Sequence, residues 1–407
     1  MRKSALLIVL VALFLVGNTV GIYTTLTSQK KLLVWDLQPL WQAGRWMIEG
    51  RGSPYSDELT HLLQMQSYGR PAQKDEDNRA FVYPLYILLF LLPLFLLPLP
   101  WAQAAWFTVL ELAAVLGAVG AMRVAGWELS ARRVLLVTLG ALVFYPMTWA
   151  LLLGQVSPPV FALMMATLLA LRAKQDSWAG TCLALTTAKP QMVFLLAPTL
   201  LLWAVAQRRY RFLVSFAAAL GALMLASFVV CPSWLMGTWR AATSYYEAQP
   251  FPSPVALMGE VIATKQASAV TVVLVLSLLA GLTEAWWREW RTQPLPMCAI
   301  SFTLVVTTLI APRTSLVNQV MLLLPLVMVL HDLSARGVWG KVIGTGLALA
   351  TVVGMWGVRA AGVIPSDPLG YRVEHVILSP ILPVTLFLVM LALRLMPGQD
   401  VVRGETR

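Results

Sequence analysis

The chain has 407 residues, of which 58% are hydrophobic and only 12% are charged, where soluble proteins carry about 25% charged residues. With a mean hydropathy of +0.74, a soluble fold of this length could not bury its apolar surface, which excludes a soluble enzyme, a secreted disulfide scaffold and a disordered chain. The 30 Lys and Arg residues exceed the 19 Asp and Glu residues, as is usual for cytoplasmic loops of membrane proteins, so we expect membrane lipids and no nucleic acid as partners.

The chain begins with an apolar stretch over residues 4–26, which follows Arg2 and Lys3. No small-residue cleavage site follows this stretch, so we interpret it as a retained first helix with its N-terminus inside the cell. Residues 27–81 then form the longest polar segment, where aromatic and charged residues alternate with apolar ones. This pattern is typical of short interfacial helices, and we place them in a long first extracytoplasmic loop.

Twelve further apolar stretches follow, and residues 232–267 between them form a second outer loop. The stretches lie near 82–100, 101–122, 133–153, 156–172, 178–188, 191–206, 211–231, 268–284, 295–312, 316–330, 340–358 and 376–394. About 20 residues are needed for each crossing, and the chain is predicted to be a single all-α transmembrane bundle of 12–13 helices, residues 1–407. Four prolines in 82–100 favour a re-entrant segment there, which leaves about twelve crossings and both termini in the cytoplasm.

Lys189 is the clearest polar residue at a predicted membrane depth, because it lies between the apolar stretches 178–188 and 191–206. Pro190 breaks the helix directly after it. A charged group in such a place is expensive and indicates function, here a site for the phosphate of a lipid. The alternative is a lysine that snorkels to the interface from a helix end.

Two other breaks between apolar stretches carry polar groups. Gln155 follows Gly154 in a turn without charged residues and could present its amide to a sugar hydroxyl, although a plain interhelical turn would look the same. Residues 311–319 contain Arg313, whose guanidinium binds phosphate in a bidentate manner, although a solvated loop is the alternative.

Asp36 opens the polar face of the first outer loop and is flanked by Trp35 and Trp41. A carboxylate close to the membrane plane is well placed to remove a proton from an acceptor hydroxyl. The alternative is a helix cap or a solvated side chain. The three cysteines and three histidines are scattered and show no metal-ligand spacing, so no metal site is predicted.

Several short motifs, taken in order, resemble glycosyltransferase family 87, polytopic bacterial enzymes related to polyprenol-phosphate-mannose-dependent mannosyltransferases. The matching motifs are Asp36 with Trp41-Gln42-Ala43-Gly44-Arg45, Glu49-Gly50, Pro54-Tyr55, Phe81-Val82-Tyr83-Pro84-Leu85, Leu153-Gly154-Gln155-Val156, Ala188-Lys189-Pro190-Gln191 and Ala311-Pro312-Arg313. The resemblance fades after residue 331. Two departures are Leu85, where a second proline is frequent, and the late outer loop, which has Arg313, Thr314 and Asn318 where a histidine or an acid is frequent.

The resemblance implies a fold of the GT-C type and an inverting glycosyltransferase, with its active site at the outer face of the bacterial cytoplasmic membrane. It implies a hexose, most simply mannose, moved from a polyprenyl-phosphate donor to a lipid or glycan acceptor, with no cofactor; acidic outer loops leave room for a divalent metal that we do not predict. Asp36 would be the general base, and Lys189 and Arg313 would hold the donor phosphate. Substrate contacts are expected from Gln155, Gln191, Asn318 and Tyr83.

Two other functions fit the same sequence features. A transporter or flippase for a lipid-linked sugar or a small anionic solute would also use broken helices and a buried lysine, but the sequence shows no internal repeat of the kind found in many transporters. A polymerase or ligase of the O-antigen type would favour a long, arginine-rich late outer loop, whereas here the longest outer loop comes first.

Overall fold

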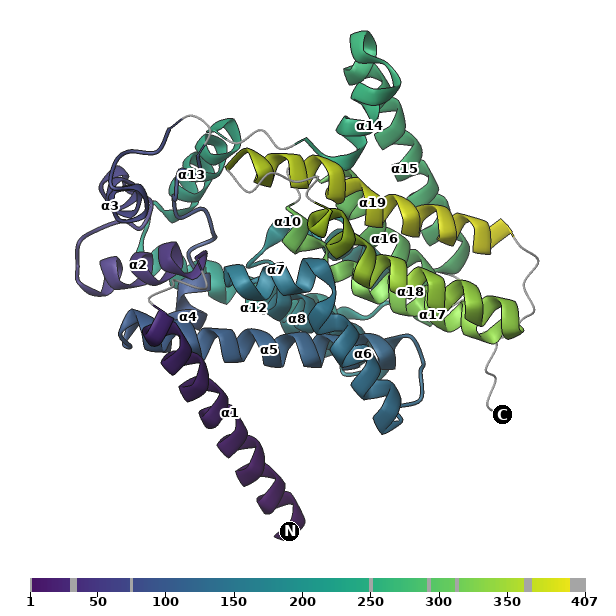
Figure 1. Ribbon diagram of the computed structural model, residues 1–407, viewed down its shortest axis with the longest axis horizontal. Coiled ribbons are helices and arrows are strands. Elements are labelled where there is room, and N and C mark those ends of the chain that lie inside the picture. Colours follow the sequence, from purple (N-terminus) through teal and green to yellow (C-terminus); the bar gives the residue numbers. More distant parts are fainter. Residues whose placement is uncertain are drawn as a thin grey trace.

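Figure 1 shows the computed structural model, in which the described residues form helices and connecting segments only. The structure describes residues 2–29, 35–73, 76–248, 252–290, 294–311, 315–361 and 368–395. The predicted all-α class and the polytopic helical bundle are confirmed.

The first half of the chain contains both long apolar helices and the short helices of the first loop. Its helices are α1 (Arg2–Gln29), α2 (Leu37–Ile48), α3 (Asp57–Tyr68), α4 (Ile87–Phe95), α5 (Leu99–Val124), α6 (Ala131–Val143), α7 (Tyr145–Leu153), α8 (Ser157–Arg172), α9 (Asp176–Thr186) and α10 (Pro190–Val193).

The second half contains most of the long helices. Its elements are α11 (Leu196–Ala206), α12 (Tyr210–Val230), α13 (Trp234–Ala248), α14 (Pro254–Ile262), η1 (Thr264–Gln266), α15 (Ala267–Glu289), α16 (Met297–Ile310), η2 (Leu316–Leu322), α17 (Leu323–Ala335), α18 (Gly337–Ala360) and α19 (Pro368–Leu395).

Fewer helices are long enough to cross a membrane than the roughly twelve crossings expected. Six helical segments within the described residues are long and apolar enough, or seven if the bent pair α6 and α7 counts as one span, and four more apolar helices are shorter. The reason is the number of breaks. Pro146 at the start of α7 accompanies a bend of 64° after α6, and Gly154 ends α7 in the left-handed region with φ 76°.

The segment 82–100 contains no helix long enough to span a membrane, and its re-entrant path stays a prediction. The one helix that lies entirely within it is α4, which has nine residues and is therefore about 14 Å long at 1.5 Å per residue, about half of the hydrocarbon thickness. Pro98 precedes the first residue of α5 and Pro100 lies in its first turn, where a missing N–H costs no helical hydrogen bond.

Small residues bring the central helices into close contact. Helices α5, α8, α9 and α12 pack side by side, and a Cβ at Gly180 of α9 would lie 2.4 Å from the Phe212 carbonyl oxygen of α12. Gly117 and Gly120 of α5 likewise face Phe161 and Met165 of α8. Close packing through small residues is how helices associate where lipid removes the hydrophobic driving force.

The first loop contains two helices, α2 and α3, which lie at one end of the molecule near α13 (Figure 1). The buried face of α2 includes Leu37, Leu40 and Ala43, and it packs against α4. Gly44 permits this contact, because a Cβ there would lie 2.2 Å from the Phe95 ring. The short helices predicted in this loop are therefore present, and α2 is fixed to the bundle.

Two polar contacts hold outer helices to the bundle. The Asn18 amide of α1 donates to Glu111 Oε2 of α5 at 2.6 Å, so this carboxylate within an apolar helix is paired with an amide. Gln319 Nε2 of η2 donates to the Ser379 carbonyl of α19 at 2.7 Å. That carbonyl would otherwise accept the N–H four residues later, where Pro383 has none.

Candidate active site

Asp36 lies at the N-terminus of α2 and is held there by its backbone. Its N–H donates to the Leu153 carbonyl of α7 at 2.8 Å, which ties the first loop to the end of α7. Its side chain makes no capping bond to α2 and is 21% exposed. The carboxylate is therefore neither a helix cap nor a solvated surface group, which were the alternatives that the sequence left open.

Gln155 bridges Asp36 and Lys189 with the two ends of its side-chain amide. The Nε2 group donates to Asp36 Oδ2, and Oε1 accepts from Lys189 Nζ at 2.6 Å. The turn that presents it is rigid, because Gln155 N–H bonds to the Ala150 carbonyl and the Trp106 indole donates to the Gly154 carbonyl at 2.8 Å. Gln155 is thus a fixed connection between a carboxylate and an ammonium group, and the 154–155 break is more than a plain turn.

Lys189 occupies the break between α9 and α10 and is 2% exposed. Besides Gln155, its ammonium group donates to Ser157 Oγ at 2.6 Å. A lysine that snorkels would extend its charge into solvent, whereas this one points into the protein. Two of its three N–H groups have these partners, and among the described residues no other hydrogen bond from Nζ is formed.

Two more predicted substrate residues lie at the edges of this network. Ser157 Oγ donates to Asn318 Oδ1 in η2 at 3.4 Å, so the network reaches the segment after α16. The Tyr83 hydroxyl lies 3.5 Å from Gln155 Oε1, at the limit of a hydrogen bond. Asp36, Tyr83, Gln155, Lys189 and Asn318 are therefore brought together from five separate parts of the chain.

The remaining predicted site residues are not placed in the network. Gln191 is half-buried in the first turn of α10, and within the described residues no hydrogen bond connects it to the others. Arg313 lies outside the described residues. No three His, Cys, Asp or Glu side chains come together as a metal site in the described part of the chain.

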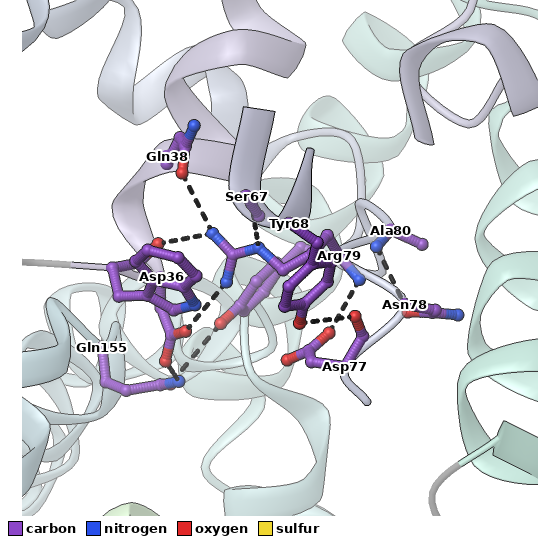
Figure 2. Close-up of polar contacts among 11 residues, drawn as sticks. Asp36, Gln38, Ser67, Tyr68, Asp77, Asn78, Arg79, Ala80 and Gln155 are labelled. Atoms are coloured by element: carbon purple, nitrogen blue, oxygen red, sulfur yellow. Dashed lines mark hydrogen bonds and ion pairs between the residues drawn. The ribbon is translucent and has the colours of Figure 1, made fainter. Parts of the chain in front are cut away.

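Arg79 is a functional candidate that sequence reasoning missed. Its Nη1 lies 3.9 Å from Asp36 Oδ1, and Figure 2 shows its guanidinium between Asp36 and Gln38. In the sequence it ends the run Lys74-Asp75-Glu76-Asp77-Asn78-Arg79, which is typical of a solvated loop. The one available signal was its position just before the motif Phe81-Val82-Tyr83-Pro84.

The site shifts the ionisation of its two central groups toward neutral pH. Burial is the main cause that raises the pKa of Asp36 from 3.8 to about 6; Asp77 adds to it, while Arg79, Gln155 and Lys189 oppose it. Burial also lowers the pKa of Lys189 to about 7, against the attraction of Asp36. A carboxylate with a pKa near 6 is a stronger base than a solvated one and is still ionised at pH 7.

Comparison with known proteins places these residues in a family context. The model of glycosyltransferase family 87 matches residues 81–312, more than half of the chain. The matched segment contains Tyr83, Gln155 and Lys189, whereas Asp36 and Arg79 lie before it. Neither the curated proteins nor the solved structures gave a match.

Proposed function

The chain belongs to glycosyltransferase family 87 and is a membrane glycosyltransferase, and from this premise we propose that it moves a hexose, mannose in our hypothesis, from a polyprenyl-phosphate donor to a lipid or glycan acceptor. The reaction would take place at the outer face of the bacterial cytoplasmic membrane, on a scaffold of the GT-C type. The observation that supports this most is the chain of contacts from Asp36 through Gln155 to Lys189, because it joins a base to a cation.

Asp36 is the proposed general base. Its carboxylate takes the proton of the acceptor hydroxyl as the acceptor oxygen forms a bond to the anomeric carbon. The bond between that carbon and the phosphate oxygen breaks, and the electron pair leaves with the lipid phosphate. Attack opposite to the leaving group inverts the anomeric centre, and the donor's own bond supplies the driving force without a nucleotide.

Lys189 is proposed to stabilise the departing phosphate. In a site with little water, a fixed cation stabilises growing negative charge more strongly than in solution. Lys189 is held by Gln155 and Ser157, so its position is set before the donor binds. No described residue accepts its third N–H, which we assign to a phosphate oxygen. Arg313, which we expect in the same outer region, is proposed as the second phosphate ligand.

The remaining polar residues are proposed to contact the sugar. Gln155, Asn318 and Tyr83 carry amide and hydroxyl groups beside the base and the lysine, and such groups bind sugar hydroxyls. We also keep Gln191 as a substrate ligand, because the first turn of α10 begins directly after Lys189. No metal or cofactor is part of this mechanism.

The function is tested with purified protein in lipid vesicles, radiolabelled polyprenyl-phosphate-mannose and extracted membrane lipids as acceptors. We expect label to appear in the acceptor lipids, and no label from GDP-mannose. Transfer from GDP-mannose alone would contradict the lipid-linked donor. Uptake of label into vesicles without a new glycosidic bond would favour a transporter instead.

A further inference from the structure

A second cation, Arg79, is buried directly beside the proposed base. Its side chain is 1% exposed, and its Nη1 lies 3.9 Å from Asp36 Oδ1. The guanidinium also stacks over the indole of Trp35, with Cζ 4.3 Å from the ring centre. A buried arginine is rare unless its charge is paired, and among the described residues its ion-pair partner is the carboxylate that we assign to catalysis.

The other donors of Arg79 are occupied by the protein framework. Nε donates to Ser67 Oγ of α3 at 3.2 Å, and Nη2 donates to the Trp35 carbonyl at 3.0 Å and to Gln38 Oε1 at 3.2 Å. Figure 2 shows these contacts around the guanidinium. These contacts hold the guanidinium with Nη1 toward Asp36, so Arg79 is suited to act on Asp36.

The backbone conformation of Arg79 also indicates that this residue is placed to act on Asp36. Its φ is 57°, in the left-handed region that a residue with a long side chain rarely adopts. Its N–H donates to Asp77 Oδ1 at 2.7 Å, which stabilises the turn. The loop therefore accepts an unfavourable conformation where it directs this side chain inward to Asp36.

We propose that Arg79 is a positioning residue for glycosyl transfer, which orients the Asp36 carboxylate beside Gln155 and keeps it ionised in its buried setting. The proposal rests on the proposed role of Asp36 as the base. Arg79 touches no reacting atom in this scheme. It acts through Asp36, and its removal is expected to change the protonation of that carboxylate.

Electrostatics sets the size of the expected effect. The charged and titratable groups that face Asp36 are Asp77 and Arg79 of the loop, Tyr83 at its end, and Lys189 of the break after α9. Burial and Asp77 favour the protonated carboxyl, while Arg79 favours the carboxylate. An opposite charge within about 4–6 Å lowers the pKa of a carboxyl by about 1–3, so loss of Arg79 should raise the protonation midpoint of Asp36 by that amount.

The test is an infrared titration of the full-length protein in lipid nanodiscs, with 13C-labelled aspartate and with the Asp36→Asn spectrum subtracted to isolate the band of Asp36. We expect a midpoint near pH 6 in the wild type, a midpoint higher by about 1–3 pH units in Arg79→Gln, and a midpoint closer to the wild type in Arg79→Lys. Arg51→Gln, which removes an exposed arginine of the same loop, should leave the midpoint unchanged.

An unchanged midpoint in Arg79→Gln, or equal displacement in Arg79→Gln and Arg79→Lys, would overturn the proposal. If Arg79→Gln does not fold, the double variant Gln38→Ala/Ser67→Ala removes two of the three hydrogen-bond anchors and leaves the charge and the bond to the Trp35 carbonyl. It should raise the midpoint part of the way; no change there would also overturn the proposal. The titration needs no substrate, so a wild type without transfer activity would speak against the proposed donor and not against Arg79.

Discussion

Asp36 and Gln155, which are 119 positions apart in the chain, are joined by a hydrogen bond from the Gln155 amide to the Asp36 carboxylate. Lys189 can only donate, so it faces the Gln155 oxygen and leaves the amide N–H groups for the carboxylate. The protonated lysine thus fixes the orientation of an amide that in turn holds the base. This arrangement makes the three residues one functional unit.

Replacement of Gln155 by leucine should break the hydrogen-bonded connection between Asp36 and Lys189. Asp36 and Lys189 would each lose a partly buried, charge-assisted hydrogen bond, worth about 1.5–3 kcal/mol, so transfer should fall by roughly 10- to 100-fold. The measurement is kcat/KM for sugar transfer. Gln207→Leu, which removes one amide bond to the Trp290 carbonyl, is the matched control. Equal activity of the two variants would contradict the role of Gln155.

The pH dependence of transfer should be a narrow bell. Below about pH 6, Asp36 carries a proton and cannot accept another; above about pH 7, Lys189 loses its proton and its charge. Activity should therefore rise through pH 6 and fall through pH 7 in a profile of kcat/KM. Lys189→Arg should move the descending limb to higher pH, because arginine stays charged. An ascending limb near pH 4, the range of a solvated carboxyl, would contradict the burial of Asp36.

Gly44→Ala should displace α2 and with it Asp36. The added Cβ would lie 2.2 Å from the Phe95 ring, and overpacking of this kind costs about 1–3 kcal/mol. We expect a lower melting temperature together with reduced transfer. The double variant Gly44→Ala/Phe95→Leu makes room for the methyl group and should recover part of both. Full activity of Gly44→Ala would show that the α2–α4 contact does not position Asp36.

Gln319→Leu should destabilise the contact between η2 and α19. It leaves the Ser379 carbonyl without its donor, and a buried unsatisfied group costs about 1–3 kcal/mol. In a Pro383→Ala background the helix regains an N–H for that carbonyl, so Gln319→Leu should cost less there. Denaturant unfolding of the four proteins in detergent measures this difference. An equal loss of unfolding free energy in both backgrounds would contradict the proposal that the Gln319 amide replaces the N–H that Pro383 lacks.

The fold class could be predicted because the amino-acid composition shows that much of the protein surface faces lipid. The 58% of hydrophobic residues indicated a helical membrane bundle. The helix breaks expected at Gly154 and Pro190 are helix boundaries in the structure. The number of helices that cross the membrane fully was harder to predict, because the same glycine and proline breaks shorten the helices. Whether two short helices form one bent span depends on packing between distant segments, which local patterns do not contain.

The candidate site was predictable where a polar residue stood alone in apolar surroundings. Lys189 and Gln155 are such residues, and both lie in the network. Arg79 was not predictable, because every residue of a charged loop looks solvent-exposed in the sequence. Its burial, its φ of 57° and its contact with Asp36 are visible in the structure alone. The pairing through Gln155 also depends on long-range geometry, and it could not be deduced from spacing.

Asp36→Asn gives the most direct test of the account. The variant keeps the size of the side chain and the backbone bond to Leu153 but cannot take a proton, and loss of a general base lowers the rate by about 10²–10⁴-fold. We therefore expect transfer of labelled mannose from polyprenyl-phosphate-mannose to fall by that factor in Asp36→Asn, and to persist in Asp57→Asn of the same loop. Undiminished transfer by a folded Asp36→Asn protein would contradict the central claim that Asp36 is the base.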